Sequence, residues 1–390
     1  MTLTVNPLAV YLHIPFCHIK CTYCAFNTYT NLDHLVEPFT TALIREIELS
    51  AASKPGQSVG TVFFGGGTPS VLSPDQFARI MEALNRGFHL QTDAEVSLEV
   101  NPSDVNQAYL AALRDVGFTR ISIGMQSAIE SELRLFNRRH DNDSVVRAVS
   151  AARRAGFDNL NLDLIYGIPH QTLENWDATL RQMLALKPEH VSLYALTLED
   201  NTPMKAWVEK GRLPAPDDDL AADMYDMATD QLGAAGYGQY EISNWAKPGR
   251  QCRHNLQYWR SLPYLGLGPG AHGFADGVRY SVILSPHRYI KILQEADAAD
   301  VYPRTPVTAE STLLRPADEI VEVLLMGLRL TDEGIHRETF RQRFGIDVLE
   351  AHGDVIRKYA DHGLMRIDDE RVLITHEGRL LSSMIFRELV

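Results

Sequence analysis

Between residue 9 and about residue 200, short hydrophobic runs rich in β-branched and aromatic residues alternate with longer amphipathic segments. The longer segments carry their hydrophobic residues at helical spacing, and several end at a glycine such as Gly117 or Gly156. We therefore predict a strand for each short run and a helix for each longer segment. The predicted strands are residues 10–14, 61–64, 95–100, 120–124, 160–165 and 191–196. The predicted helices between them are residues 34–52, 74–86, 105–116, 143–155 and 173–185.

Strands that alternate with helices of this length form parallel βαβ units, and six units are too few for a complete eightfold barrel. The carboxyl ends of parallel strands lie at one edge, where ligand sites form. Distinctive residues stand at or just after the ends of five predicted strands. They are a cysteine cluster, the run Gly65-Gly66-Gly67-Thr68-Pro69, Glu99, Gln126 and Asp163. The pattern therefore predicts an α/β fold with one shared site.

Beyond residue 200 the pattern is less regular, and prolines at positions 303 and 306 interrupt it. We place a domain boundary there, with residues 1–300 as the first domain and its extension, and residues 301–390 as the second. The second domain has predicted helices at 316–328, 337–344, 348–362 and 377–389, and a two-stranded wing at 364–375. This pattern is typical of a small, mainly helical, winged-helix-like domain. Because the segment is not strongly basic, we expect a structural or lid role and not DNA binding.

Cys17, Cys21 and Cys24 form a C-x3-C-x2-C triplet directly after the first predicted strand. Thiolates favour iron–sulfur clusters and zinc over hard cations. Three thiolates can hold three irons of a [4Fe–4S] cluster and leave the fourth iron without a protein ligand. A structural zinc site needs four ligands, and His18 or His13 would have to complete it. The triplet therefore favours the cluster, with zinc as the alternative.

The composition describes an ordinary soluble globular protein. Its 390 residues include 50 acidic and 37 basic ones, for a formal net charge of −13. The chain lacks the basic extension typical of nucleic-acid-binding proteins, so a nucleic-acid partner is disfavoured. No stretch has the length of a membrane span, and residues 1–7 lack the layout of a signal peptide. The clustered thiols suit a reducing compartment. We therefore expect a cytoplasmic protein.

The triplet, with the aromatic Tyr23 before its last cysteine, resembles the radical S-adenosylmethionine (SAM) superfamily. The resemblance implies an open (β/α)6 partial barrel and a [4Fe–4S] cluster whose open iron binds SAM, with an electron donor as a partner. It also implies SAM-contacting residues in the strand-end motifs. These are Tyr11, Tyr23, Gly66, Gly67, Thr68, Glu99, Gln126, Arg138 and Asp163. Each of these features, taken singly, also has a structural alternative. The glycine run would be an ordinary tight turn, Tyr11 would pack in the core, and Glu99 would form a salt bridge with a core arginine.

Residues 11–17, 65–69 and 161–169 and the C-terminal domain resemble the oxygen-independent coproporphyrinogen III oxidase family over nearly the whole chain. The decarboxylating oxidases of this family carry a fourth cysteine two residues after the third, and an N-terminal extension. Here that position holds Phe26, and only ten residues precede Tyr11. The chain instead resembles the heme chaperone branch, HemW, which binds heme and hands it to acceptor proteins.

The stretch from His254 to Trp259 reads H-N-x-x-Y-W, with Cys252 two residues upstream. A histidine beside aromatic residues suits a porphyrin, which needs an axial ligand and flat apolar walls. We predict His254 as an axial heme ligand, with a purely structural histidine as the alternative; Cys252 is either a second ligand candidate or an inert thiol. Two functions stay open. One is heme transfer to an acceptor protein, with no catalytic residue assigned, and the other is radical decarboxylation of coproporphyrinogen III.

Overall fold

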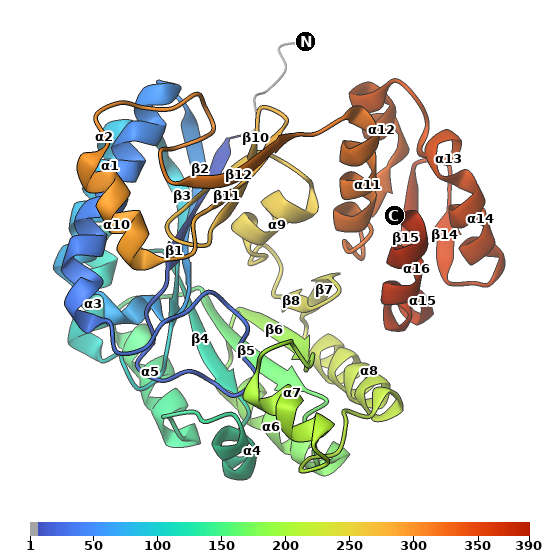
Figure 1. Cartoon of the computed structure of the whole chain (residues 1–390). Helices are drawn as coiled ribbons and strands as arrows, with labels where there is room; N and C mark the ends of the chain where they lie inside the picture. Colours follow the sequence, from blue (N-terminus) through green and yellow to red (C-terminus); the bar gives the residue numbers. More distant parts are fainter. Residues whose placement is uncertain (1–6) are drawn as a thin grey trace.

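The computed structural model describes residues 7–390, so the expectation about a leader segment concerns mainly residues outside the described part. Six parallel strands form the centre of the molecule, each hydrogen-bonded to the next in chain order (Figure 1). They are β1 (Leu8–Ile14), β2 (Ser58–Gly66), β3 (His89–Val100), β4 (Arg120–Gln126), β5 (Leu160–Tyr166) and β6 (His190–Ala195). The six predicted strands are confirmed, and each observed strand is as long as predicted or longer.

Helices cover the outer face of this sheet, and their buried faces form one hydrophobic core with it. Those that follow the strands are α1 (Val36–Ser53), α2 (Pro74–Gly87), α3 (Gln107–Val116), α4 (Glu130–Leu135), α5 (Asn142–Arg154) and α6 (Leu173–Ala185), with the short 3-10 turns η1 (Asp33–Leu35) and η2 (Pro69–Val71). Local signals set several ends. Ser73 and Gln76 form a capping box at the start of α2, and Gly117 ends α3 with a φ of 112°. No helix among residues 7–390 is long and apolar enough to cross a membrane.

The inner faces of the parallel strands are unusually polar. On β4, Ile121 and Ile123 point into the core, whereas the alternate residues Arg120 and Ser122 line a cavity inside the curved sheet. The same alternation places Asn161 and Asp163 of β5 inside. We call this inner cavity the lumen. Because polar side chains fill its walls, the inside of the sheet is a space for ligands or water and not a packed apolar core.

Further strands extend both edges of the sheet to twelve strands. Beside β1 lie β9 (Tyr264–Leu267), β10 (His272–Ala275), β11 (Val278–Val282) and β12 (Thr308–Leu313), and beside β6 lie β8 (Asn244–Ala246) and β7 (Gly238–Glu241). The connecting helices are α7 (Pro203–Glu209), α8 (Asp218–Ala234), α9 (Arg253–Trp259) and α10 (Pro286–Glu295). Strands β12 and β7 form the two edges and do not pair with each other, so the barrel stays open.

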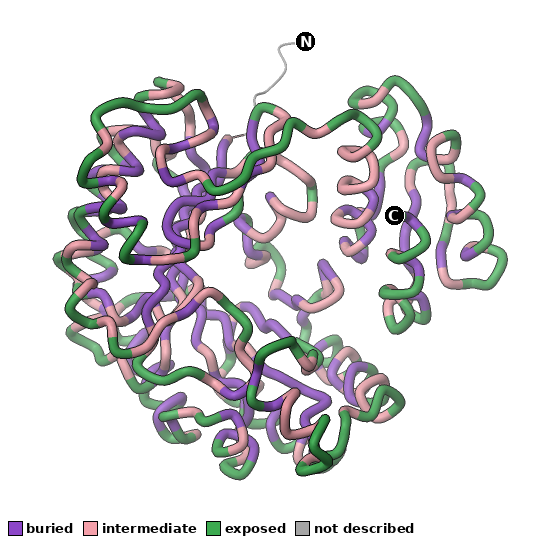
Figure 2. The backbone as a smooth tube through the Cα atoms, viewed as in Figure 1, coloured by how far each residue is buried: buried purple, intermediate pink, exposed green. Residues whose placement is uncertain are grey.

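The C-terminal residues form a separate small domain with its own hydrophobic core (Figure 2). Its helices are α11 (Pro316–Gly327), α12 (Arg337–Phe344), α13 (Val348–Ala351), α14 (Gly353–Asp361), α15 (His376–Leu380) and α16 (Ser382–Leu389). The predicted wing is present as β14 (Met365–Ile367) and β15 (Arg371–Ile374), joined by β13 (Ile335–His336). This matches the winged-helix-like pattern.

Three details of the prediction for this region need correction. The boundary at residue 300 lies too early, because β12 pairs with β11 and so belongs to the large sheet. The predicted helix 348–362 is two helices, since His352 leaves the helical conformation with a φ of −139°. The segment 377–389 likewise divides into α15 and α16 around Leu381, whose φ is −107°.

Candidate functional site

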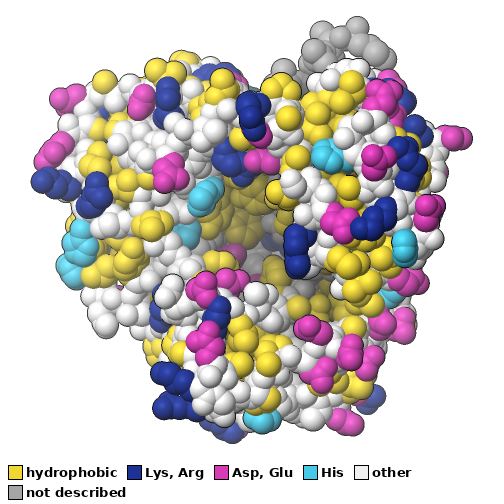
Figure 3. All heavy atoms as spheres, turned by 45° about the vertical axis from the view of Figure 1, so that its right-hand side comes forward, with side chains coloured by type: hydrophobic (Ala, Val, Ile, Leu, Met, Phe, Trp, Pro, Cys, Tyr) yellow, Lys and Arg dark blue, Asp and Glu magenta, His cyan; other side chains and the backbone are white. Residues whose placement is uncertain are grey.

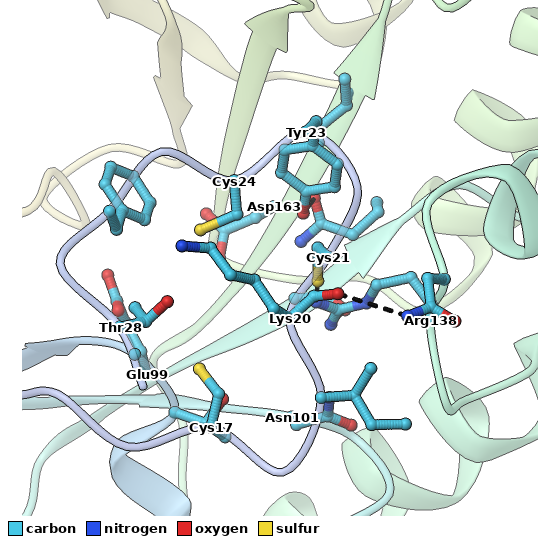
Figure 4. A pocket seen from close by; sticks show the side chains of 18 of the residues that line it. Cys17, Lys20, Cys21, Tyr23, Cys24, Thr28, Glu99, Asn101, Arg138 and Asp163 are labelled. Atoms are coloured by element: carbon cyan, nitrogen blue, oxygen red, sulfur yellow. Dashed lines mark hydrogen bonds between the residues drawn. The ribbon is translucent and has the colours of Figure 1, made fainter. Parts of the chain in front are cut away.

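A cavity of about 660 Å³ opens at the carboxyl ends of the parallel strands. This volume lies within the range of ordinary small-ligand sites. It is lined by most of the residues that the sequence singled out, although they come from distant parts of the chain (Figure 4). These residues are Cys17, Cys21, Tyr23, Cys24, Gly66, Gly67, Thr68, Glu99, Gln126, Arg138 and Asp163. The structure therefore brings the predicted strand-end motifs into one site.

The three cysteines lie on the loop after β1, and their sulfurs turn toward the same space (Figure 4). All three are half-buried and free of disulfides. Thr68 Oγ1 donates a hydrogen bond to Cys17 Sγ at 3.3 Å, and Arg138 Nη1 donates one to Cys21 Sγ at 3.5 Å. Burial raises the pKa of Cys17 and Cys24, so in the empty site the thiol form is favoured. Coordination by a metal would reverse that preference, because the metal binds the thiolate.

The donor set fits a cluster better than a single zinc ion. Among residues 7–390, no three His, Cys, Asp or Glu side chains converge closely enough to hold one ion. His13, a candidate fourth zinc ligand, uses both ring nitrogens: Nδ1 accepts a hydrogen bond from Tyr11 at 3.0 Å, and Nε2 donates one to the Asn27 carbonyl at 3.0 Å. His18 is exposed on the cysteine loop. A cluster needs no histidine, since each thiolate binds a different iron.

The glycine run holds the cysteine loop against the end of β2. Gly67 N–H donates to the Ile14 carbonyl at 2.8 Å, and Thr68 N–H donates to the Phe16 carbonyl at 2.8 Å. A Cβ on Gly67 would lie 2.6 Å from the Phe16 oxygen, and one on Gly66 would lie 2.5 Å from the His13 ring. Gly66 also has a φ of 110°, which disfavours other residues. The run is therefore required for the close approach of two loops.

Two half-buried carboxylic acids stand at the base of the cavity. Glu99 accepts a hydrogen bond from the Gly66 N–H at 3.2 Å, and burial, with the nearby charge of Asp163, raises its pKa to about 8. Asp163 accepts hydrogen bonds from Ser122 at 2.8 Å and Asn161 at 2.7 Å, while burial raises its pKa. The oxygens of each carboxyl group can accept further hydrogen bonds from the hydroxyl or ammonium groups of a ligand.

Arg138, Gln126 and Tyr23 form the wall beside Cys21. Arg138 is held by bonds from Nη2 to the Gly124 carbonyl at 3.0 Å and from Nε to His140 Nδ1 at 3.4 Å. Gln126 has a φ of 65°, and its Oε1 accepts a hydrogen bond from the Tyr23 hydroxyl at 3.4 Å. The planar guanidinium, fixed in this way, is suited to a ligand carboxylate.

Tyr11 lies in the lumen and does not line the outer cavity. The lumen has a volume of about 180 Å³ and shares Glu99, Ser122, Asp163 and Tyr194 with the outer cavity. Tyr11 is therefore one layer below the site, where it orients His13 through its hydroxyl.

The structure places His254 away from the cysteine site. This residue lies at the amino-terminal ends of the strands, opposite the cysteines, and only 1% of it is exposed. Its Nδ1 is 2.8 Å from Thr61 Oγ1 and its Nε2 is 2.8 Å from the Tyr258 hydroxyl, so neither nitrogen is free. Burial lowers the pKa of His254 to about 3. The lumen is also smaller than ordinary ligand pockets. This setting favours the structural alternative for His254 over an axial heme ligand.

Sequence reasoning missed several residues that line the two cavities. Lys20 lies within the cysteine loop and lines the outer cavity, and Tyr194 lies at the end of β6 between both cavities. Ser122 and Asn161 support Asp163. Strand alternation contained the signal for Asn161, since it stands two residues before Asp163 and so shares its face.

Comparison with known proteins identifies two regions. Residues 11–183 match the radical SAM superfamily, and residues 314–381 match the HemN C-terminal domain. The solved structure of HemN, the coproporphyrinogen III oxidase of Escherichia coli described as a radical SAM enzyme, has a TM-score of 0.84 and 25% identity. The match covers 99% of this chain and 90% of the HemN chain. The predicted fold class, a partial radical SAM barrel with a small helical domain, is thereby confirmed.

Curated relatives match along almost the full length. "Heme chaperone HemW" of Mycobacterium tuberculosis (strain CDC 1551 / Oshkosh) is 37% identical over 99% of this chain and 95% of that protein. The protein of the same name from Bacillus subtilis (strain 168) is 35% identical over 97% of this chain and 98% of that protein. "Radical S-adenosyl methionine domain-containing protein 1, mitochondrial" of Mus musculus is 37% identical over 95% and 84%. The chain therefore belongs to the HemW family of the radical SAM superfamily.

Proposed function

We propose that this protein is a heme chaperone that binds heme and transfers it to an acceptor protein, and that it carries a SAM-binding [4Fe–4S] cluster. The observation that carries the proposal is the match to relatives named as heme chaperones, at 37% identity over 99% of the chain. A match of this extent includes both the barrel and the C-terminal domain. The acceptor protein, an electron donor and a cytoplasmic location are parts of the same proposal.

Phe26 supports heme transfer over coproporphyrinogen oxidation. It stands two residues after Cys24, where the resemblance places a fourth cysteine in the decarboxylating enzymes. The side chain lines the outer cavity, and the residue is 68% exposed. A large exposed aromatic residue at the rim of a cavity favours contact with an apolar partner or ligand.

The cluster and SAM fit the residues of the outer cavity. We assign Cys17, Cys21 and Cys24 to the cluster, with Thr68 and Arg138 as hydrogen-bond donors to the sulfurs. For SAM we assign the remaining residues of the predicted set that line the cavity. They are Tyr23, Gly66, Gly67, Glu99, Gln126 and Asp163, together with the guanidinium of Arg138. The bound pair supplies one-electron chemistry, and this chain's residues position it and limit its exposure to water.

Heme needs a flat apolar surface, and the mouth of the site offers one. Leu284 lies beside the cysteine loop, since its carbonyl accepts hydrogen bonds from Asn27 Nδ2 at 3.0 Å and from the Tyr29 hydroxyl at 3.2 Å. Leu284 is 61% exposed. A hollow with hydrophobic side chains on its floor lies between the barrel and the C-terminal domain (Figure 3). We place heme in this hollow and propose that the exposed side chains of Phe26 and Leu284 contact it.

Heme transfer is tested with the full chain, reconstituted anaerobically with iron and sulfide. Heme titration should give a Soret band, and addition of apomyoglobin should move that signal to myoglobin. Phe26→Ser should weaken heme binding, whereas Leu313→Ser, 72% exposed on the edge strand β12, should not. Conversion of coproporphyrinogen III to protoporphyrinogen by a protein that binds no heme would replace this proposal with the oxidase.

A further inference from the structure

We infer that the lumen is a carboxylate-binding subsite in which Arg120 is the cationic partner. The inference rests on the proposed function and extends it. Heme, whose propionates carry carboxylates, would insert one of these groups beneath the outer cavity. The juxtaposition that carries the inference is a buried guanidinium without a carboxylate partner, facing an internal polar cavity.

Arg120 stands at the start of β4, and only 2% of it is exposed. Its Nη1 donates to Asn159 Oδ1 at 2.9 Å and, more weakly, to the Arg250 carbonyl at 3.5 Å. Within residues 7–390, Nε and Nη2 donate to no residue, and no carboxylate oxygen lies within 4.0 Å of the guanidinium. A buried guanidinium without an anion is costly, and Arg is the side chain best shaped for a carboxylate.

The carboxylates in the vicinity already have other partners. Glu95 accepts hydrogen bonds from the Arg253 N–H at 3.2 Å and the His254 N–H at 3.1 Å, so it serves the first turn of α9. Asp163 accepts from Ser122 and Asn161. The raised pKa of Glu99, about 8, leaves that group largely neutral at pH 7. Among residues 7–390, Arg120 is the only Lys or Arg side chain that lines the lumen, and it makes no direct ion pair with these carboxylates.

The histidine beside Arg120 is fixed as a neutral ring. Asn161 Nδ2 donates to Ser122 and Asp163, so its Oδ1 is the acceptor for His190 Nδ1 at 2.6 Å. His190 Nε2 is then left to accept from the Tyr240 hydroxyl at 2.7 Å. Burial, with the charge of Arg120, lowers the pKa of His190 well below its usual value. Arg120 is thus the cation that faces the lumen near this ring.

The inference allows a ligand arm two directions of entry to the lumen. On one side, Glu99, Ser122, Asp163 and Tyr194 line both the lumen and the outer cavity. On the opposite side, the half-buried Asn255 and Tyr258 of α9 line it. At about 180 Å³ the lumen accepts a short carboxylate arm and excludes a macrocycle.

The test compares heme with heme dimethyl ester, which lacks free carboxylates, on the full reconstituted chain. The unmodified protein should bind the ester about tenfold more weakly or worse, the cost of a lost charged hydrogen bond. Arg120→Gln should weaken heme binding by a similar factor and leave ester binding unchanged, and Arg120→Lys should recover part of the loss. The ester comparison needs no variant, so it stands even if Arg120→Gln does not fold.

A second arm measures SAM affinity by calorimetry. If Arg120→Gln weakens SAM binding while heme and its ester bind alike, Arg120 supports the SAM site and the propionate subsite is wrong. Equal binding of heme and ester by the parent, with SAM affinity unchanged in Arg120→Gln, would mean that only water fills the lumen, and the inference is wrong. If the parent binds no heme, the proposed function fails, and the SAM arm alone decides the role of Arg120.

Discussion

Glu99 is half-buried at the base of the site, and desolvation together with the charge of Asp163 raises its pKa to about 8 from an ordinary value near 4.5. Between these two values, the folded state holds a proton that the unfolded state has lost. The free energy of unfolding of the cluster-free protein should therefore fall as pH rises from about 5 to 8, by up to about 1.4 kcal/mol per pH unit from this group. Above pH 8 this contribution levels off.

Urea denaturation of Glu99→Gln at pH 5.5 and pH 8 checks this expectation, because glutamine keeps the shape and removes the titration. The variant should lose less stability over that interval than the parent. Glu310→Gln, on the exposed strand β12, is the matched control and should follow the parent. Parallel pH profiles for the parent and Glu99→Gln would contradict the raised pKa.

The four cysteines should behave as two classes. Cys252 is buried at the amino-terminal ends of the strands, where burial and Glu95 raise its pKa to about 12, so its thiol is inert. We expect Cys24→Ser to lose the cluster and Cys252→Ser to keep it. Iron and sulfide analysis after anaerobic reconstitution measures this. Loss of the cluster in Cys252→Ser, with the cluster retained in Cys24→Ser, would contradict the assignment.

At the scale of elements, the contact between β2 and the cysteine loop positions the site. Gly67→Ala should separate the two, because the added Cβ would lie 2.6 Å from the Phe16 oxygen and 2.9 Å from the Ile14 oxygen. The cluster should then assemble in lower yield and SAM should bind more weakly. Gly233→Ala in α8 is the control: nothing lies within 4 Å of its new Cβ, and alanine favours helix by about 1 kcal/mol. Normal cluster content in Gly67→Ala would show that the loop adapts.

At the scale of the whole molecule, an ion pair joins the C-terminal domain to the barrel. Arg329 Nη2 lies 3.1 Å from Glu241 Oε2, whose side chain is fully buried, and the guanidinium lies 4.6 Å from the centre of the Trp259 ring. Arg329→Ala leaves Glu241 buried without its partner, so we expect a loss of about 3 kcal/mol in stability. Limited proteolysis should also release the C-terminal domain more readily.

The matched control for the interface is Arg366→Ala. Arg366 is 3.9 Å from Asp368 in an exposed pair within the small domain, and such pairs contribute little. Heme transfer should be slower in Arg329→Ala than in Arg366→Ala if the hollow between the domains receives heme. Equal stability and equal proteolysis of the two variants would show that the Arg329 pair does not hold the domains together.

The sequence by itself determined the parallel strands, their helices and the cysteine site. These features depend on local patterns: residues 173–185 have helical periodicity and form α6 with those bounds, and Glu99 and Asp163 stand at strand ends that parallel topology must bring together. The short strands β7 to β12 were not predicted as such. Segments of three to six residues carry little periodic signal, and the two strands that join them to the central sheet, β9 beside β1 and β8 beside β6, lie far from those partners in the chain.

Only the tertiary structure decided the surroundings of His254 and Arg120. Both are polar residues in short motifs, and sequence cannot show whether a polar side chain meets a partner across the barrel. His254 meets Thr61 from β2 and is satisfied, whereas Arg120 meets no carboxylate within 4.0 Å among residues 7–390. The cost of burying a polar group depends on such distant partners, so the difference between a structural residue and a binding residue arises only when the strands assemble.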